Sequence, residues 1–414
     1  MHAGPNDFNK MAAVLHNRYK NENHIVFQSK NNKSGQTHVG IEQLGIWFAE
    51  EVVACLRQHD MQLRGIKSGK KHLFSFLGHS LGGLIVRHSL ALLYGEDLPI
   101  DYPFRTIFDQ RYRDILEPTS FFTLSCPHLG CRRNNGGIKR SAWRASIHAF
   151  LKFFGKTGTQ MRLADHLKNR SVKIEDTCIL QRMAEPDSPF MHALCKFKFR
   201  TVLATTHHDV SVPFCSGSIR TVNPYPEASR GKPDFRIVGY SNFDRDYERV
   251  FERHLQFEAH SDVVIGPPIG EQSIRVHEGD VLKNDSAVYR YVSEEGIVSY
   301  GSDLKGTEFD ETAGEQLEHY MHDEKRQMTF LTDMVSNLHK LSWRRIDVEF
   351  RFRDHLEQLF VHILPIGSTK NLTHTKVLRE LSMAGARCVD AGVSMLELDH
   401  KKMLQSMIQE ETQL

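Results

Sequence analysis

Short apolar segments alternate along the chain with segments of helical periodicity, and this alternation predicts the arrangement of the fold. Runs that favour strands occur at 24–29, 72–78, 120–130, 199–214 and 343–355, of which the last three continue into loops. Residues 40–58 place apolar side chains at helical spacing, and 81–95 is a second helix that ends at a glycine. Strands that alternate with helices indicate an α/β protein.

A change of composition predicts the domain organisation. Residues 223–331 are rich in turn formers and acidic residues, as in "NPYPEASRGKPD" and "SYGSDLKGTEFDETAGEQ", and they lack a long periodic core pattern. We therefore predict a core over 1–222, a large insertion over 223–331, a last core strand with its loop over 332–368 and a helical tail over 369–414.

Charge and cysteine content exclude several classes of protein. The 414 residues include 53 Lys and Arg and 51 Asp and Glu, a formal charge of +2, so no nucleic-acid partner is expected. The 7 cysteines form no Cys-x-x-Cys pair, which fits a reducing compartment. No apolar run approaches the roughly 18 residues of a membrane span, and the first residues contain no signal-peptide core. The sequence thus predicts a soluble, cytoplasmic protein.

One motif lies at the junction of a predicted strand and a predicted helix. The stretch "SFLGHSLGGLIVR" (75–87) contains Gly-x-Ser-x-Gly centred on Ser80. This context is typical of a nucleophile elbow, in which a sharp turn presents the serine hydroxyl above the sheet. Gly78 and Gly82 would let strand and helix approach, and the Leu81 backbone NH would face a substrate oxyanion. An ordinary serine N-cap is the alternative.

A serine hydroxyl is a poor nucleophile unless a histidine, oriented by a carboxylate, removes its proton. In proteins with such an elbow, the acid comes after the serine in the sequence and the histidine comes after the acid. Each lies on a loop at the carboxyl end of a strand. Asp209 follows the strand "RTVLATT", and His355 follows "RRIDVEFRF". These are the predicted acid and base, and His362, on the same stretch, is the rival base.

Several stretches occur in an order that is specific to one family. They are "THVGIEQLGIWFAEEV", "FLGHSLGGLIVR", "FFTLSCPHLG", "GKTGTQMRLAD", "DSPFMHALCKFKFRTVLA", "DVSVP" and "WRRIDVEFRFRDH". Together they resemble the putative serine esterase family of lipase-like α/β-hydrolases. The resemblance implies an α/β-hydrolase fold, a mostly parallel sheet with helices on both faces, that hydrolyses lipid esters with Ser80 as nucleophile, Asp209 as acid and His355 as base. We expect no cofactor and no metal.

The N-terminal region departs from the family pattern. In such enzymes the first core strand ends in a His-Gly loop whose amides complete the oxyanion hole, and a Pro-x-Asp-Phe-like segment follows. Here "GPNDF" (4–8) is present without that strand and loop. Losing one oxyanion donor costs about 10²- to 10³-fold in turnover, so we expect a natural start upstream of Met1.

A basic segment follows the "CPHLG" stretch, where lipases of this fold often carry a lid. From Cys131 to Ala164 there is no acidic residue, and 131–164 is the predicted lid. Its candidate membrane-facing side chains are Trp143, Ile147, Phe150 and Phe154. The pattern is typical of an interfacial helix on an anionic membrane or lipid droplet surface, and equally of a helix packed on the core.

Two other functions compete with ester hydrolysis. A catalytically weak or inactive relative would serve as a lipid or protein interaction platform. A metal site would use the histidines His207, His208, His254 and His260, although their spacing matches no ligand signature that we can name.

Overall fold

The computed structural model describes most of the chain in separate ranges. They are 5–64, 71–94, 110–131, 151–165, 178–220, 223, 225, 230–254, 289–293, 296–300, 331, 333–367 and 376–413. The strands are β1 (His72–His79), β2 (Leu116–Leu124), β3 (Phe199–Thr205), β4 (Asp234–Ser241), β5 (Tyr289–Ser293), β6 (Gly296–Tyr300) and β7 (Arg344–Arg351). The α-helices are α1 (Asn9–Arg18), α2 (Ile41–Gln58), α3 (Asp60–Arg64), α4 (Leu81–Tyr94), α5 (Gln110–Ile115), α7 (Gly155–Met161), α8 (Ile179–Arg182), α9 (Pro189–Cys195), α10 (Phe214–Ser218), α11 (Arg245–His254) and α13 (Lys376–Gln413). The 3-10 helices are η1 (Pro5–Phe8), η2 (Ser34–His38) and η6 (Glu357–Ile366).

The main sheet has the strand order β1-β2-β3-β7-β4. The first four strands are parallel, and β4 runs antiparallel to β7. Along the parallel part, Gly78 pairs with Thr123, Leu124 with Leu203, and Thr205 with Val348. The strands therefore end at one common edge, and the loops that leave them meet there.

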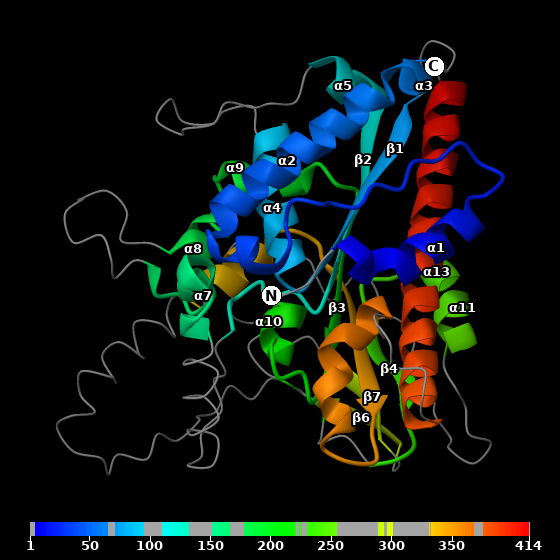
Figure 1. The fold of residues 1–414 in the computed structure, drawn as a ribbon. Coiled ribbons are helices and arrows are strands. Elements are labelled where there is room, and N and C mark those ends of the chain that lie inside the picture. Colours follow the sequence, from blue (N-terminus) through cyan, green and yellow to red (C-terminus); the bar gives the residue numbers. More distant parts are fainter. Residues whose placement is uncertain are drawn as a thin grey trace.

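Helices cover both faces of this sheet (Figure 1). The helices α2, α4 and α9 lie on one side and contribute buried Leu44, Leu84 and Leu194 to a first core cluster. The helices α1, α11 and α13 lie on the other side, where Leu381 and Val389 of α13 belong to a second cluster. Burial on both faces explains the consecutive buried residues of β2 and β3, whereas β7 alternates apolar with charged side chains.

The segment 24–29, predicted as a strand, forms none. Its side chains alternate in burial, and Ile25 and Phe27 are 36% and 37% exposed. A strand requires a hydrogen-bonded neighbour, and among the described residues β1 is an edge strand with β2 on one side. The apolar pattern alone therefore overestimated the sheet.

The predicted insertion and tail both contribute to the core. The strand β4 lies inside 223–331 yet extends the main sheet, and α11 packs with it and with α13. The tail is a long helix with buried side chains, and its Asp399 forms a buried ion pair with Arg344 at 2.6 Å. The acidic and turn-rich composition of 223–331 concealed a short amphipathic strand.

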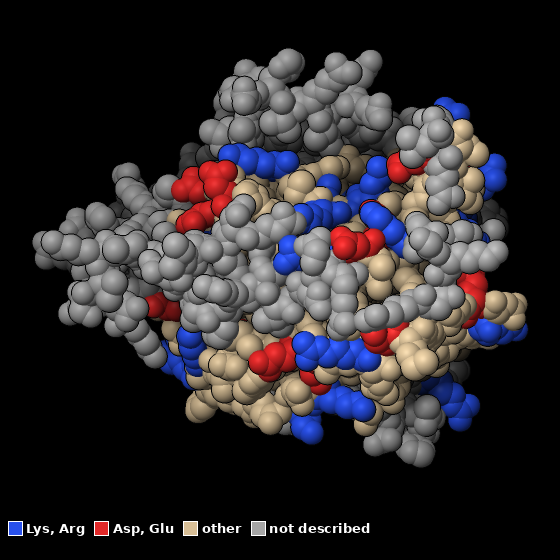
Figure 2. Space-filling view, turned by 90° about the horizontal axis from the view of Figure 1, so that it is seen from above, with Lys and Arg blue, Asp and Glu red and all other residues tan. Residues whose placement is uncertain are grey.

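Charged side chains of both signs are interspersed over the described part of the face seen in Figure 2. This mixture agrees with the formal charge of +2. Of the helices in the described ranges, none combines the length and apolar character that crossing a bilayer would need.

Candidate active site

Ser80 occupies a strained turn between β1 and α4. Its φ of 53° lies in the left-handed region, which costs a residue with a side chain roughly 1–3 kcal/mol. Two main-chain hydrogen bonds hold the turn: the Ser80 amide donates to the Leu124 carbonyl at 2.9 Å, and the Gly83 amide donates to the Ser80 carbonyl at 3.1 Å. The neighbouring strand thus fixes the serine at the carboxyl edge of the sheet.

Glycines allow the strand and the helix to approach at this turn. A Cβ on Gly78 would lie 2.5 Å from the Gly83 Cα, and a Cβ on Gly83 would lie 2.5 Å from the Cys126 Sγ. A Cβ on Gly82 would meet nothing within 4 Å. The close packing expected of Gly78 and Gly82 is therefore made by Gly78 and Gly83, because Gly82 faces open space.

Asp209 lies in the loop after β3, where the sequence predicted it. Its side chain is 2% exposed, and its Oδ1 accepts the backbone amides of Ser211 and Val212, each at 2.9 Å. Burial would raise the pKa of Asp209, but the charge and hydrogen bond of His362 and the two amides outweigh it and hold this pKa below its usual value. The side chain is therefore a carboxylate that can only accept hydrogen bonds.

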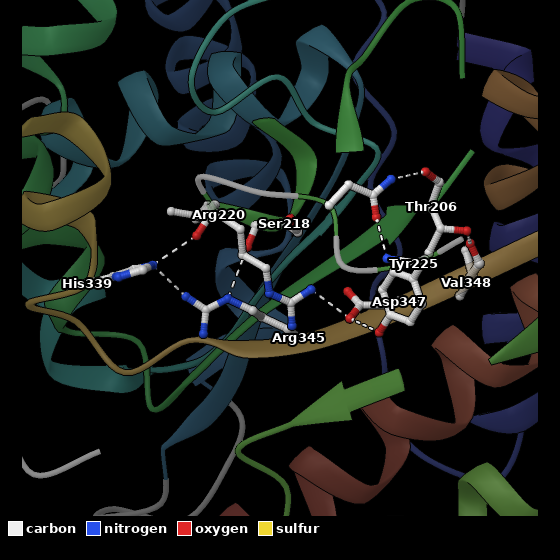
Figure 3. Close-up of polar contacts among 10 residues, drawn as sticks. Thr206, Ser218, Arg220, Tyr225, His339, Arg345, Asp347 and Val348 are labelled. Carbon is white, nitrogen blue, oxygen red and sulfur yellow. Dashed lines mark hydrogen bonds and ion pairs between the residues drawn. The ribbon is translucent and has the colours of Figure 1, made fainter. Parts of the chain in front are cut away.

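A polar network centred on the buried Arg220 and Asp347 holds both ends of this loop (Figure 3). Asp347 of β7 is 1% exposed, and its Oδ2 accepts from Arg220 Nη1 and from the Tyr225 hydroxyl, each at 2.6 Å. Asn223 donates to the Thr206 carbonyl at 2.8 Å. The chain before and after Asp209 is thus tied to the central sheet.

His362, and not His355, lies between Ser80 and Asp209. Its Nε2 is 2.7 Å from the Ser80 Oγ, and its Nδ1 is 2.9 Å and 3.1 Å from the two Asp209 carboxylate oxygens. The neighbours Val361 and Leu364 on η6 are fully buried, which fixes the side of this short helix that faces the serine.

The expectation that His355 completes the constellation is wrong in its geometry. His355 is exposed, and its ring nitrogens contact Arg230 Nη2 at 3.2 Å and Gln358 Oε1 at 3.1 Å. It lies in the turn that Asp354 stabilises by accepting the amides of Leu356 and Glu357. The chain first makes this outward turn after β7, and only η6 returns to the edge of the sheet.

The hydrogen bonds define where the protons lie. Because the Asp209 carboxylate accepts, the Nδ1 of His362 carries a proton, and in the neutral ring the lone pair then lies on Nε2. The Ser80 hydroxyl can then donate to Nε2 at 2.7 Å. This is the arrangement in which a histidine can remove the proton of a serine during attack on a carbonyl.

The other predicted residues have mixed outcomes. Leu81 is the first residue of α4, and amides in the first turn of a helix have no acceptor within the helix.

Phe154 is 3% exposed and packs edge-on against His38, so the prediction that it faces a membrane is wrong. The neighbouring Phe153 is 80% exposed. Trp143, Ile147 and Phe150 lie outside the described residues.

The metal alternative finds no geometric basis in the described part of the chain. No group of three or more His, Cys, Asp or Glu side chains there is arranged to hold an ion. His207 and His208 lie next to Asp209 with ring centroids 6.1 Å apart, whereas His260 falls outside the described residues.

A mostly parallel sheet flanked by helices, with a strained serine between strand and helix, defines an α/β-hydrolase-like protein. Residues 1–221 match the family described as "Putative serine esterase (DUF676)", which is more than half of the chain. The chain belongs to this family, whose description points to ester hydrolysis.

Two fungal proteins are similar to parts of the chain. "Putative lipase ROG1" of Saccharomyces cerevisiae is 30% identical over 186 residues, which is 44% of this chain and 22% of that protein. "Putative lipase C4A8.10" of Schizosaccharomyces pombe is 26% identical over 140 residues, which is 34% of this chain and 15% of that protein. The chain thus matches a minor part of each relative. No solved structure matches it.

A signal in the sequence could have distinguished the two histidines. His362 interrupts the apolar run "LFVHILPI", whereas His355 follows the charged "RFRD". Apolar neighbours anchor a histidine in the protein, and charged neighbours are typical of an exposed turn.

Proposed function

We propose that the chain is a serine hydrolase that cleaves carboxylic esters, with Ser80 as nucleophile, His362 as general base and Asp209 as the orienting carboxylate. The observation that carries the proposal is the bridge from the Ser80 Oγ through both ring nitrogens of His362 to Asp209. The strained φ of Ser80 supports it, since such backbone strain is typical of functional sites.

The reaction follows from these positions. Ser80 Oγ attacks the ester carbonyl carbon while its proton moves to His362 Nε2, and the alcohol leaves with that proton. Water then attacks the acyl-Ser80 ester, again giving a proton to Nε2, and the collapse of the intermediate returns the proton to Ser80 and frees the acid. The Leu81 amide is the proposed donor to the oxyanion in both steps.

Lipid esters, acylglycerols or phospholipids, are the proposed substrates. The support is that both named relatives are described as putative lipases. The chain would meet such substrates at an anionic membrane or lipid droplet surface, using the basic segment 131–164. Within its described part Phe153 is the exposed aromatic residue, so Phe153→Ser is expected to weaken sedimentation with anionic vesicles, and unchanged sedimentation would count against this contact.

The test of the chemistry is labelling with a fluorophosphonate, which reacts only with an activated serine. The wild type should be labelled and should hydrolyse short acyl esters, whereas Ser80→Ala should do neither. Ser125→Ala is the matched control, since Ser125 also has a positive φ at a strand end but contacts Thr205 and not a histidine. An unlabelled wild type would favour the interaction-platform alternative.

A further inference from the structure

A second imidazole touches the main chain of His362. His79 is the last residue of β1, directly before Ser80, and its Nε2 lies 2.6 Å from the carbonyl oxygen of His362. The two rings lie 4.8 Å apart between centroids. Because a carbonyl oxygen can only accept a hydrogen bond, the Nε2 of His79 carries a proton and is the donor of this hydrogen bond.

The carbonyl of His362 lacks the hydrogen bond that a 3-10 helix normally gives it. In a 3-10 helix the carbonyl of residue i accepts the amide of residue i+3. In η6 the residue three positions after His362 is Pro365, which has no amide hydrogen. The His79 side chain supplies the hydrogen bond that Pro365 cannot donate at this position.

The surroundings keep His79 neutral and fixed. Burial lowers the pKa of His79 to about 3, with the nearby His362 acting in the same direction. A neutral donor does not repel the imidazolium that His362 becomes during turnover. The ring of Phe8 from η1 packs edge-on against His79 at 6.4 Å between centroids, so three parts of the chain meet at this side chain.

We propose that His79 is a positioning residue that fixes the main chain of His362, and through it the Nε2–Ser80 contact, by donating to the carbonyl to which Pro365 cannot donate. This inference rests on the proposed function. A shift of about 1 Å in a catalytic group can lower the rate about 100-fold, so the expected effect is on kcat and not on substrate affinity.

Replacing His79 by residues with and without a side-chain amide distinguishes a loss of the hydrogen bond from a loss of packing. Gln places its amide nitrogen where the imidazole Nε2 lies, whereas Asn reaches only the Nδ1 position and Leu donates nothing. We expect His79→Gln to keep kcat within about threefold, and His79→Leu and His79→Asn to lower it about 10- to 100-fold at unchanged KM. In His79→Leu, adding Pro365→Ala supplies a main-chain amide at the same carbonyl and should recover part of kcat.

A control of the same chemistry exists on the same strand. His72 is the first residue of β1, at the opposite end of the strand from Ser80. Its Nε2 lies 2.7 Å from the Leu63 carbonyl oxygen. His72→Leu and His72→Gln should leave kcat unchanged, whatever they do to the melting temperature. The proposal is overturned if His79→Leu retains wild-type kcat, or if His79→Gln falls as far as His79→Leu.

A spectroscopic readout separates this proposal from the proposed function. The proton on His362 Nδ1, shared with Asp209, should give a far-downfield proton resonance in wild type and His79→Gln, and a weakened or broadened one in His79→Leu. This readout needs no substrate, so it tests the positioning role even if the wild type hydrolyses no ester. An identical resonance in all three proteins would overturn the proposal.

Discussion

The Nε2 of His362 lies 2.7 Å from the Oγ of Ser80, across 282 positions of sequence. This contact exists because η6 returns the chain to the edge of the sheet where β1 ends. If this contact is catalytic, replacing His362 should affect activity much more than replacing His355, although both histidines follow the same strand.

His362→Ala is expected to lower kcat for a short acyl ester about 10⁴-fold or more, because the serine loses its base. His355→Ala should change kcat by less than about threefold, since His355 contacts only Arg230 and Gln358 among the groups described around it. Steady-state kinetics of the two purified variants decides the matter. The reverse result would restore His355 as the base.

The sequence predicted the parallel strands, the strained serine and Asp209, because each depends on local pattern: an apolar run, a glycine-flanked turn, or a polar residue directly after a strand. It did not predict which histidine returns to the serine. That choice depends on how a loop turns after β7, and there the outward turn at Asp354 and the burial of Val361 decide the outcome. Chain spacing alone contains no such information.

The two glycines of the Gly-x-Ser-x-Gly motif should respond differently to alanine. Gly78→Ala places a Cβ 2.5 Å from the Gly83 Cα, and a main-chain atom cannot move aside, so we expect a loss of about 1–3 kcal/mol or more in the free energy of unfolding. Gly82→Ala has open space and an ordinary helical position, so stability should be unchanged or rise by up to about 1 kcal/mol. Urea unfolding of both variants measures this, and equal losses would mean that the elbow packs differently.

The ion pair between Arg220 and Asp347 should matter for the stability of the loop that holds Asp209. Arg220→Met leaves Asp347, which is 1% exposed, as a buried charge without its cation, and is expected to lower the free energy of unfolding by about 3–5 kcal/mol. The double change Arg220→Met and Asp347→Leu removes both charges, so it should lose less than the sum of the single changes. Strict additivity in the urea-unfolding cycle would show that the two side chains do not interact.

Four buried or half-buried histidines should make the protein sensitive to mild acid. Burial lowers the pKa of His79 to about 3 and of His88 to about 4, and it also lowers those of His128 and His400. In the unfolded chain these groups titrate near 6.5, so below that pH the unfolded state binds more protons than the native state. Their contribution is therefore fully present above about pH 6.5 and is lost as pH falls, by up to about 1.4 kcal/mol per pH unit for each histidine.

The depressed pKa of Asp209 acts in the same direction but at lower pH, because its contribution is lost only below the unfolded value of about 3.9. Urea unfolding at pH 7.5, 6.5 and 5.5, a range that leaves Asp209 ionised, should show a free energy of unfolding that falls with pH because of the histidines. Burial raises the pKa of Asp165 and of Glu349, which acts in the opposite direction, so Asp165→Asn and Glu349→Gln serve as the background in which the histidines are measured. His79→Gln removes one of the titrating groups, so its stability should fall less steeply with pH than that of the wild type. A stability that stays constant between pH 7.5 and 5.5 would mean that these rings take up protons in the native protein over the same pH range as in the unfolded chain, so that at pH 5.5 a protonated His79 would be a like charge beside the imidazolium of His362.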